Sequence, residues 1–159
     1  MKDISFNTGD IVFNYRVAII IRNGIKILVQ KDNRVSHLAL PGGRCMLNET
    51  SVSAGMREFL EETNLQTEYI RPLAVIENFF KSSFNGKKYH EILFIHELKL
   101  LDELKYNETI IKNIEDTKKE HISYIWMDIT ELKNNNFKPQ VVLDILDESS
   151  FIHLVNKDC

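Results

Sequence analysis

Four glutamates fall within fourteen residues, at Glu49, Glu58, Glu61 and Glu62. Residues 51–63 are rich in helix formers, so we predict that the last three lie on a helix. At spacings of i, i+3 and i+4 they project from one face of that helix. Each pair of like charges ~5 Å apart costs about 3 kcal/mol at an effective dielectric near ~20, before salt screening. A divalent cation relieves this repulsion, and carboxylate oxygens in this number suit Mg²⁺ or Mn²⁺.

A pair of glycines, Gly42 and Gly43, precedes the predicted helix. Glycine lets the backbone approach a ligand closely and direct its amides or carbonyls at that ligand. A loop that leads into a helix N-terminus also favours anionic groups such as phosphate. A metal cluster beside such a loop suits a diphosphate substrate, because the metal screens its charge and activates a water molecule.

The whole segment resembles the Nudix box. The pattern of that box is Gly, five residues, Glu, seven residues, Arg-Glu-apolar, one residue, Glu-Glu, one residue and Gly-apolar. The positions that match are Gly43, Glu49, Arg57, Glu58, Phe59, Glu61, Glu62 and Leu65. Asn64 stands where the family usually has glycine, and asparagine is the next most tolerant residue at a left-handed helix end. The resemblance covers residues 42–65 tightly and most of the chain loosely.

The resemblance implies an α/β fold, a Nudix-type α/β/α sandwich around a mixed β-sheet. It implies metal ligation by three carboxylates with help from one backbone carbonyl, at Glu58, Glu61, Glu62 and Gly42. It also implies that Glu49 and Arg57 form a supporting ion pair between loop and helix. An i,i+4 pair of Arg57 with Glu61 is compatible with that role.

The implied activity is metal-dependent hydrolysis of the diphosphate linkage in a nucleoside diphosphate joined to another group. Gly43 and Arg44 are the expected substrate contacts, with Arg44 stabilising charge on the phosphoryl oxygens. One glutamate, in the cluster or at Glu120, is expected to accept the proton of the attacking water. A solvated charge beside Lys118 and Lys119 is the slightly favoured alternative for Glu120.

Family branches that cleave ADP-ribose or dinucleoside polyphosphates carry an added proline or tyrosine beyond the box. Here Phe79, Phe80 and Lys81 occupy that neighbourhood, so neither signature is present. A nucleoside triphosphate or its damaged form is therefore the first substrate expectation, and a nucleotide sugar is the second. A non-catalytic nucleotide-sensing module is the alternative function, although such modules are expected to lose the glutamates. RNA decapping is a third alternative, against which the absence of a basic tract argues.

The composition fits one domain over residues 1–159. Twenty basic residues against 23 acidic ones give a formal charge of −3, which offers no long-range attraction to nucleic acid or an anionic membrane. Two cysteines, Cys45 and Cys159, form no disulfide or zinc pattern, and no apolar run suggests a signal peptide or a membrane span. We expect a cytoplasmic protein with a small-molecule nucleotide as partner and a homodimer as an open alternative.

Residues 17–21 are predicted to form a strand buried on both faces, followed by a hairpin turn at Asn23-Gly24 and a returning strand at 25–30. Further strands are expected at residues 37–40, 70–80, 89–101 and 122–127, and helices at 129–134 and 140–146. The polar span 102–119 is expected to be a mobile loop. Glu91 and Glu97 lie in the apolar strand 89–101, so each requires a partner or an exposed edge. A structural partner is favoured for Glu91, and substrate contact stays open.

Overall fold

The computed structural model describes residues 2–115 and 121–158. In this part of the chain ten strands form one mixed sheet in the order β10-β6-β7-β2-β3-β9-β8, with β1 and β5 paired to β2 and β4 paired to β3. The strands are β1 (Ser5–Asn7), β2 (Ile11–Asn23), β3 (Lys26–Asp32), β4 (Leu38–Ala39), β5 (Gly42–Arg44), β6 (Thr67–Lys81), β7 (Lys88–Leu100), β8 (Ile110–Lys112), β9 (Ile122–Asp128) and β10 (Ile152–Asp158). The helices are α1 (Ser51–Thr63) and α2 (Ile129–Lys133), with 3-10 turns η1 (Glu103–Asn107) and η3 (Gln140–Ile145).

Strand β2 lies at the centre of the sheet and organises the site. One edge pairs in parallel with β7 along Ile11–Ile21, and the other pairs in turn with β1, β5 and β3. Its β-branched residues Val17, Ile19, Ile20 and Ile21 are almost fully buried, as expected for a strand covered on both faces. The prediction for residues 17–21 is confirmed, and the strand extends further in both directions.

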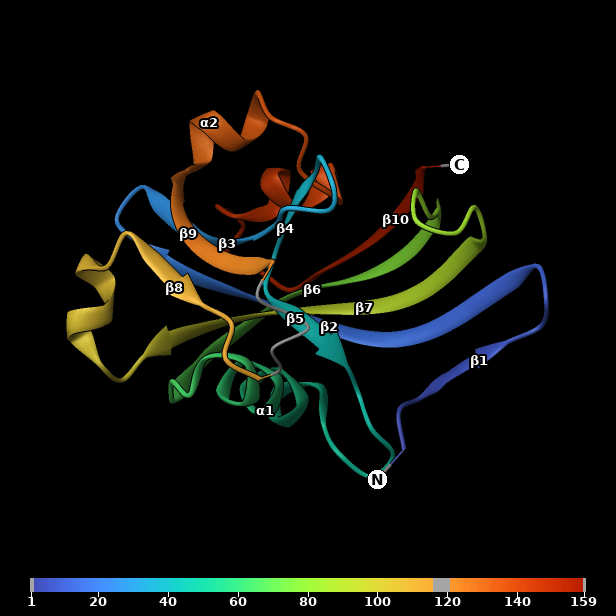
Figure 1. Ribbon diagram of the computed structural model, residues 1–159, viewed down its shortest axis with the longest axis horizontal. Helices are drawn as coiled ribbons and strands as arrows, with labels where there is room; N and C mark the ends of the chain where they lie inside the picture. Colours follow the sequence, from blue (N-terminus) through green and yellow to red (C-terminus); the bar gives the residue numbers. More distant parts are fainter. Residues whose placement is uncertain (1, 116–120, 159) are drawn as a thin grey trace.

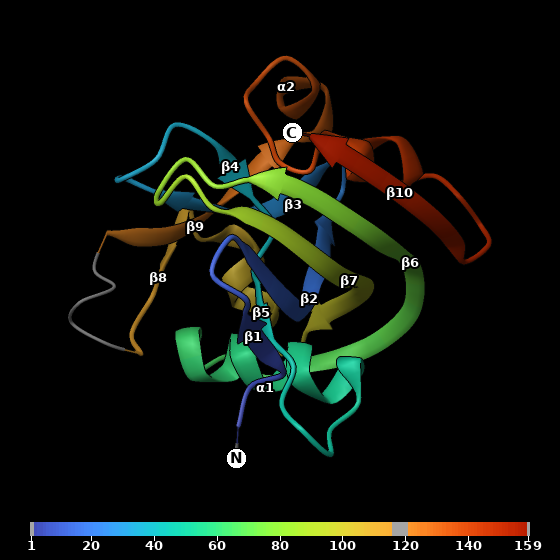
Figure 2. The same ribbon diagram turned by 90° about the vertical axis from the view of Figure 1, so that its right-hand side faces the viewer.

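Helix α1 covers one face of the sheet, and α2 with η3 covers part of the other (Figures 1 and 2). On the α1 side, Phe59 packs in a cluster with Ile19 and Leu98. On the opposite side, Leu132 and Leu143 pack in a second cluster that includes Ile20 and Ile95. The predicted arrangement of helices on both sides of a mixed sheet is therefore confirmed.

The predicted helix boundaries are confirmed at α1. Thr50 is the N-cap, and its hydroxyl oxygen accepts a hydrogen bond from the amide of Ser53 at 3.1 Å. Asn64 ends the helix in the left-handed conformation, with φ 57°. Gly55 faces β2, where an added Cβ would lie only 3.0 Å from Ile19, so this glycine permits close packing of helix and sheet.

Asn64 is expected to limit the stability of the helix end. Replacing it with glycine removes the Cβ from a left-handed residue, so we expect the free energy of unfolding to rise by about 0.5–1 kcal/mol. Replacement with valine is expected to lower it by about 1–2 kcal/mol, because a β-branched side chain tolerates this φ poorly. Urea denaturation of the three proteins tests both signs. A valine variant as stable as the glycine variant would contradict the capping role.

Several expectations were incomplete or wrong. Part of the span 102–119 is structured, because it contains η1 and β8. The helical segment expected at residues 140–146 is the 3-10 helix η3. Strands β1 and β10 were not predicted; β10 pairs in parallel with β6, a contact between residues far apart in the sequence. Among the described residues, no helix is long and apolar enough to cross a bilayer.

Candidate active site

Arg57 joins helix α1 to the loop that precedes it. Its Nε and Nη2 donate to the two oxygens of Glu49, at 3.0 and 2.7 Å, in a two-pronged ion pair. Nη2 also donates to the carbonyl oxygen of Arg44 at 3.1 Å, and Glu49 accepts from the amide of Met46 at 2.7 Å. The planar guanidinium suits such a geometry better than a lysine would. The structure thus brings together Glu49 and Arg57 as the box spacing implied.

The charges of this pair stabilise each other. Hydrogen bonds from Arg57 hold the pKa of Glu49 below its usual value of 4.5, although burial opposes this. The same pair raises the pKa of Arg57, which remains charged throughout. A carboxylate whose pKa is lowered by folding stabilises the protein at pH values above the pKa that the group has in the unfolded chain. This contribution is lost as the pH falls through the pKa that the group has in the folded chain.

Glu49→Gln tests this linkage. We expect the variant to unfold about 2 kcal/mol more easily at pH 7, because an amide leaves the Arg57 guanidinium poorly paired. The difference from the wild type should begin to shrink below pH 4.5, the ordinary pKa of glutamate, because the unfolded chain then takes up a proton at Glu49. It should be lost as the pH falls through the lowered pKa of folded Glu49, where the native carboxylate becomes protonated too. Urea denaturation at pH 7 and pH 3 measures it. An equal difference at both pH values would contradict this assignment.

Glu58 lies against the backbone of Gly43. A Cβ added to Gly43 would overlap the carboxyl group of Glu58, so only glycine leaves space for this side chain here. Burial raises the pKa of Glu58, and the nearby charges of Glu61 and Glu115 act in the same direction. A hydrogen bond from Arg57 Nη1 to Glu58 Oε1 at 3.1 Å opposes the shift. Glu58 is therefore a desolvated carboxylate that a further cation would stabilise.

Glu61 and Glu62 differ in environment although they are adjacent. The Glu61 side chain is 43% exposed and lies 3.3 Å from Arg57 Nη1. Glu62 is buried, and its Oε2 accepts a hydrogen bond from the hydroxyl of Tyr124 on β9. Its backbone carbonyl accepts from the amide of Ile114 at 2.7 Å, which fastens the segment after β8 to the end of α1. The role of Tyr124 was missed, since nothing local in the sequence places β9 beside α1.

The candidate metal ligands are chemically suited to a hard divalent cation. All the candidate ligands are oxygens, as Mg²⁺ and Mn²⁺ prefer, and Glu58 is desolvated beside a like charge. Within residues 2–115 and 121–158, however, no three His, Cys, Asp or Glu side chains converge closely enough to hold a metal ion. Arg57 Nη1 lies between Glu58 and Glu61 and supplies positive charge there. A cation bound by these carboxylates would take over contacts that Arg57 Nη1 now makes.

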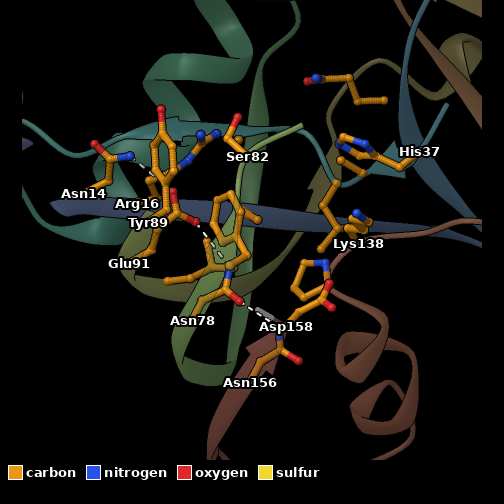
Figure 3. A pocket seen from close by; sticks show the side chains of 18 of the residues that line it. Asn14, Arg16, His37, Asn78, Ser82, Tyr89, Glu91, Lys138, Asn156 and Asp158 are labelled. Atoms are coloured by element: carbon orange, nitrogen blue, oxygen red, sulfur yellow. Dashed lines mark hydrogen bonds between the residues drawn. The ribbon is translucent and has the colours of Figure 1, made fainter. Parts of the chain in front are cut away.

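A cavity of about 360 Å³ is shown in Figure 3. Ala18 and Ile95 line it, and both belong to the core cluster on the sheet face opposite α1. Gly42 and Arg44 contribute to its wall, so the glycine loop separates the carboxylate cluster from the cavity and borders both. Arg16 lines the cavity too, and it is the direct cross-strand partner of Arg44. The two arginines place positive charge where the cavity meets the loop. Arg16 was not predicted as a site residue, because its position depends on the pairing of β2 with β5.

The other residues singled out in the sequence include Glu120, Cys45 and Glu97. Glu120 lies outside the described residues. Cys45 is fully buried, and desolvation raises the pKa of its thiol to about 12, so it is unreactive. Of the two alternatives expected for Glu97, a partner or an exposed edge, the structure shows partners: Arg22 at 3.1 Å and Arg71 at 3.4 Å.

Comparison with known proteins gives a match of residues 12–145 to the family model described as the NUDIX domain. Similar solved structures include a NUDIX hydrolase from Nitrosomonas europaea, with 22% identity and a TM-score of 0.62 over 91% of this chain and 79% of that one. A MutT protein from Bacillus halodurans has 12% identity and a TM-score of 0.61 over 91% and 90%. An ADP-ribose pyrophosphatase from Streptococcus suis has 17% identity and a TM-score of 0.57 over 90% and 98%. At such identities the structural likeness shows the fold alone.

Proposed function

The chain belongs to the Nudix family, and on this premise we propose that it hydrolyses a phosphoanhydride bond of a nucleotide. The observation that supports this most strongly is the position of the glycine loop. The desolvated Glu58 packs against Gly43 on one side of the loop, and Gly42 lines a cavity of nucleotide size on the other. Solved structures of this fold include both a MutT protein and an ADP-ribose pyrophosphatase, so the fold by itself selects no substrate.

Each group of site residues has its own role in the proposed reaction. The family typically uses a divalent cation. In this chain the cation would be held by Glu58, Glu61, Glu62 and the carbonyl of Gly42. When bound, the cation screens the diphosphate and lowers the pKa of a water molecule. Arg57 keeps the loop and helix in register through Glu49 and the carbonyl of Arg44.

The reaction itself is a displacement at phosphorus. The water oxygen forms a bond to one phosphorus atom, the bridging P–O bond breaks, and its electron pair leaves with the departing phosphate. A glutamate accepts the water proton, and Glu61 is the solvent-exposed member of the cluster. Arg44 and Arg16 bind the phosphoryl oxygens from the cavity side and stabilise their developing charge. A nucleoside triphosphate or its damaged form is the preferred substrate in this proposal, and a nucleotide sugar is the second.

A non-catalytic nucleotide sensor is the second candidate function. The existing contacts of the cluster favour it in one respect, because Glu58 and Glu61 already pair with Arg57 and Glu62 accepts from Tyr124. A sensor needs the cavity and the arginines but no reacting water.

A substrate panel separates the two candidates. The protein is incubated with Mg²⁺ and nucleoside triphosphates, ADP-ribose, nucleotide sugars and dinucleotides, and the products are resolved by ion-exchange chromatography. We expect cleavage that EDTA abolishes, with triphosphates turned over most efficiently. Saturable nucleotide binding without turnover of any compound would overturn the hydrolase and support the sensor.

A further inference from the structure

A row of polar side chains crosses the cavity floor. Asn14 on β2, Glu91 on β7 and Asn78 on β6 are direct cross-strand neighbours. Asn156 on β10 is in turn the partner of Asn78. All four line the cavity, and Figure 3 shows them side by side. Four adjacent strands therefore each contribute one polar group to a single line.

The hydrogen bonds of this row converge on one carboxylate. Asn14 Nδ2 donates to Glu91 Oε2, and Asn78 Nδ2 donates to Glu91 Oε1, both at 3.3 Å. The outer members orient the inner ones: Ser5 Oγ donates to Asn14 Oδ1 at 2.6 Å, and Asn156 Nδ2 donates to Asn78 Oδ1 at 2.8 Å. Donors thus point toward Glu91 from both sides, which makes it the acceptor at the centre of the floor.

Glu91 is buried but only partly satisfied. It is 5% exposed, and no Lys, Arg or His among residues 2–115 and 121–158 forms an ion pair with it. An ionised carboxylate can accept about four hydrogen bonds. Glu91 accepts only one from each of the two asparagines, and both are long at 3.3 Å. Burying a charge in this state is costly unless further donors complete it. The cavity is the direction from which such donors can come.

The surroundings of Glu91 suit a flat ring. The rings of Phe80 and Tyr89 line the cavity and stack on each other at 5.0 Å with 10° between their planes. Phe84 lines it from the turn between β6 and β7, and the guanidinium of Arg34 lies 5.3 Å from its ring centre. Aromatic faces of this kind hold nucleobases by stacking.

We propose that Glu91 is a specificity-determining residue that binds the N–H edge of a nucleobase, with preference for guanine. Guanine presents a ring N–H and an amino group side by side, and two adjacent donors match the two oxygens of one carboxylate. Adenine, cytosine and uracil each lack one of these donors. The proposal rests on the proposed function only for the placement of the phosphates, which extend from the base toward Arg16 and Arg44.

Binding of nucleoside monophosphates tests this without any hydrolysis. Isothermal titration calorimetry in EDTA compares GMP, IMP and UMP; IMP differs from GMP only in lacking the amino group. We expect GMP to bind at least about tenfold more tightly than IMP, since a missing donor leaves a buried polar group unpaired. Equal affinities, or no saturable binding of any of the three, would overturn the proposal. This comparison uses the wild-type chain, so it does not depend on the folding of a variant.

Glu91→Gln then assigns the preference to this residue. We expect GMP to bind about tenfold more weakly and the ratio of GMP to IMP affinity to approach one, because the amide offers only one acceptor oxygen. Glu77→Gln is the matched control: Glu77 lies on β6 next to Asn78, does not line the cavity, and pairs with His153 at 2.7 Å. A Glu91→Gln variant that folds and keeps the wild-type ratio would contradict the assignment.

The outcome also separates this inference from the proposed function. Discrimination between GMP and IMP without turnover of any compound in the substrate panel would support the base pocket and overturn the hydrolase. Turnover of triphosphates with no preference among bases would retain the hydrolase and overturn the role of Glu91.

Discussion

Replacing Glu61 with glutamine is expected to lower kcat for nucleotide hydrolysis by at least about 100-fold. Glutamine keeps the shape of the side chain, but it neither accepts a proton nor offers a charged oxygen to a cation. Stability should change by less than about 1 kcal/mol, because the side chain is 43% exposed and its ion pair with Arg57 is a surface i,i+4 contact. The measurement is steady-state hydrolysis with saturating Mg²⁺, together with urea denaturation.

Glu68→Gln is the matched control for this substitution. Glu68 is a similarly exposed glutamate on β6, 3.4 Å from Lys99, and it does not line the cavity. It should retain full activity. A Glu61→Gln enzyme with kcat within about threefold of the wild type would show that catalysis does not depend on this carboxylate.

The two loop glycines are expected to respond very differently to alanine. At Gly42 the new Cβ would overlap the carbonyl oxygen of Val17 in the backbone of β2, so the β2–β5 pair must move apart. We expect a loss of about 3 kcal/mol or more in the free energy of unfolding. At Gly43 the new Cβ would overlap only the end of the Glu58 side chain, which can rotate away. Stability should then change little, while kcat falls about 10- to 100-fold as the carboxylate is displaced.

Urea denaturation and kcat measured on both variants test this contrast, and each variant serves as the control of the other. Equal losses of stability in Gly42→Ala and Gly43→Ala would contradict the packing described for β5. A Gly43→Ala enzyme with normal kcat would contradict the placement of Glu58 in catalysis.

Local signals allowed the helix of the site to be predicted closely, with Thr50 and Ser51 as the two candidate N-caps. Thr50 and Asn64 carry capping preferences that act within one turn, so the bounds of α1 can be recognised without tertiary information. The pairing of Glu49 with Arg57 followed from the spacing of the Nudix box, and the geometry brings the two side chains together.

Features that depend on strand register could not be predicted. The row from Asn14 to Asn156 exists only because β2, β7, β6 and β10 pair in one particular alignment, and β10 itself was missed. Glu91 could be singled out as a charge in an apolar strand, but its partners lie 13 and 77 residues away in the sequence. The burial of Glu62 likewise follows from Tyr124, which reaches α1 from a distant strand.

Binding of Mn²⁺, followed by the loss of its free-ion electron paramagnetic resonance signal, tests most directly whether the carboxylates of α1 hold the cation. We expect saturable binding by the wild-type chain, and binding at least about tenfold weaker in Glu58→Gln at unchanged far-ultraviolet circular dichroism. Glu68→Gln should bind Mn²⁺ as the wild type does. Equal Mn²⁺ affinity in the wild type and a folded Glu58→Gln variant would show that these carboxylates do not hold the cation, because it would then bind elsewhere or not at all.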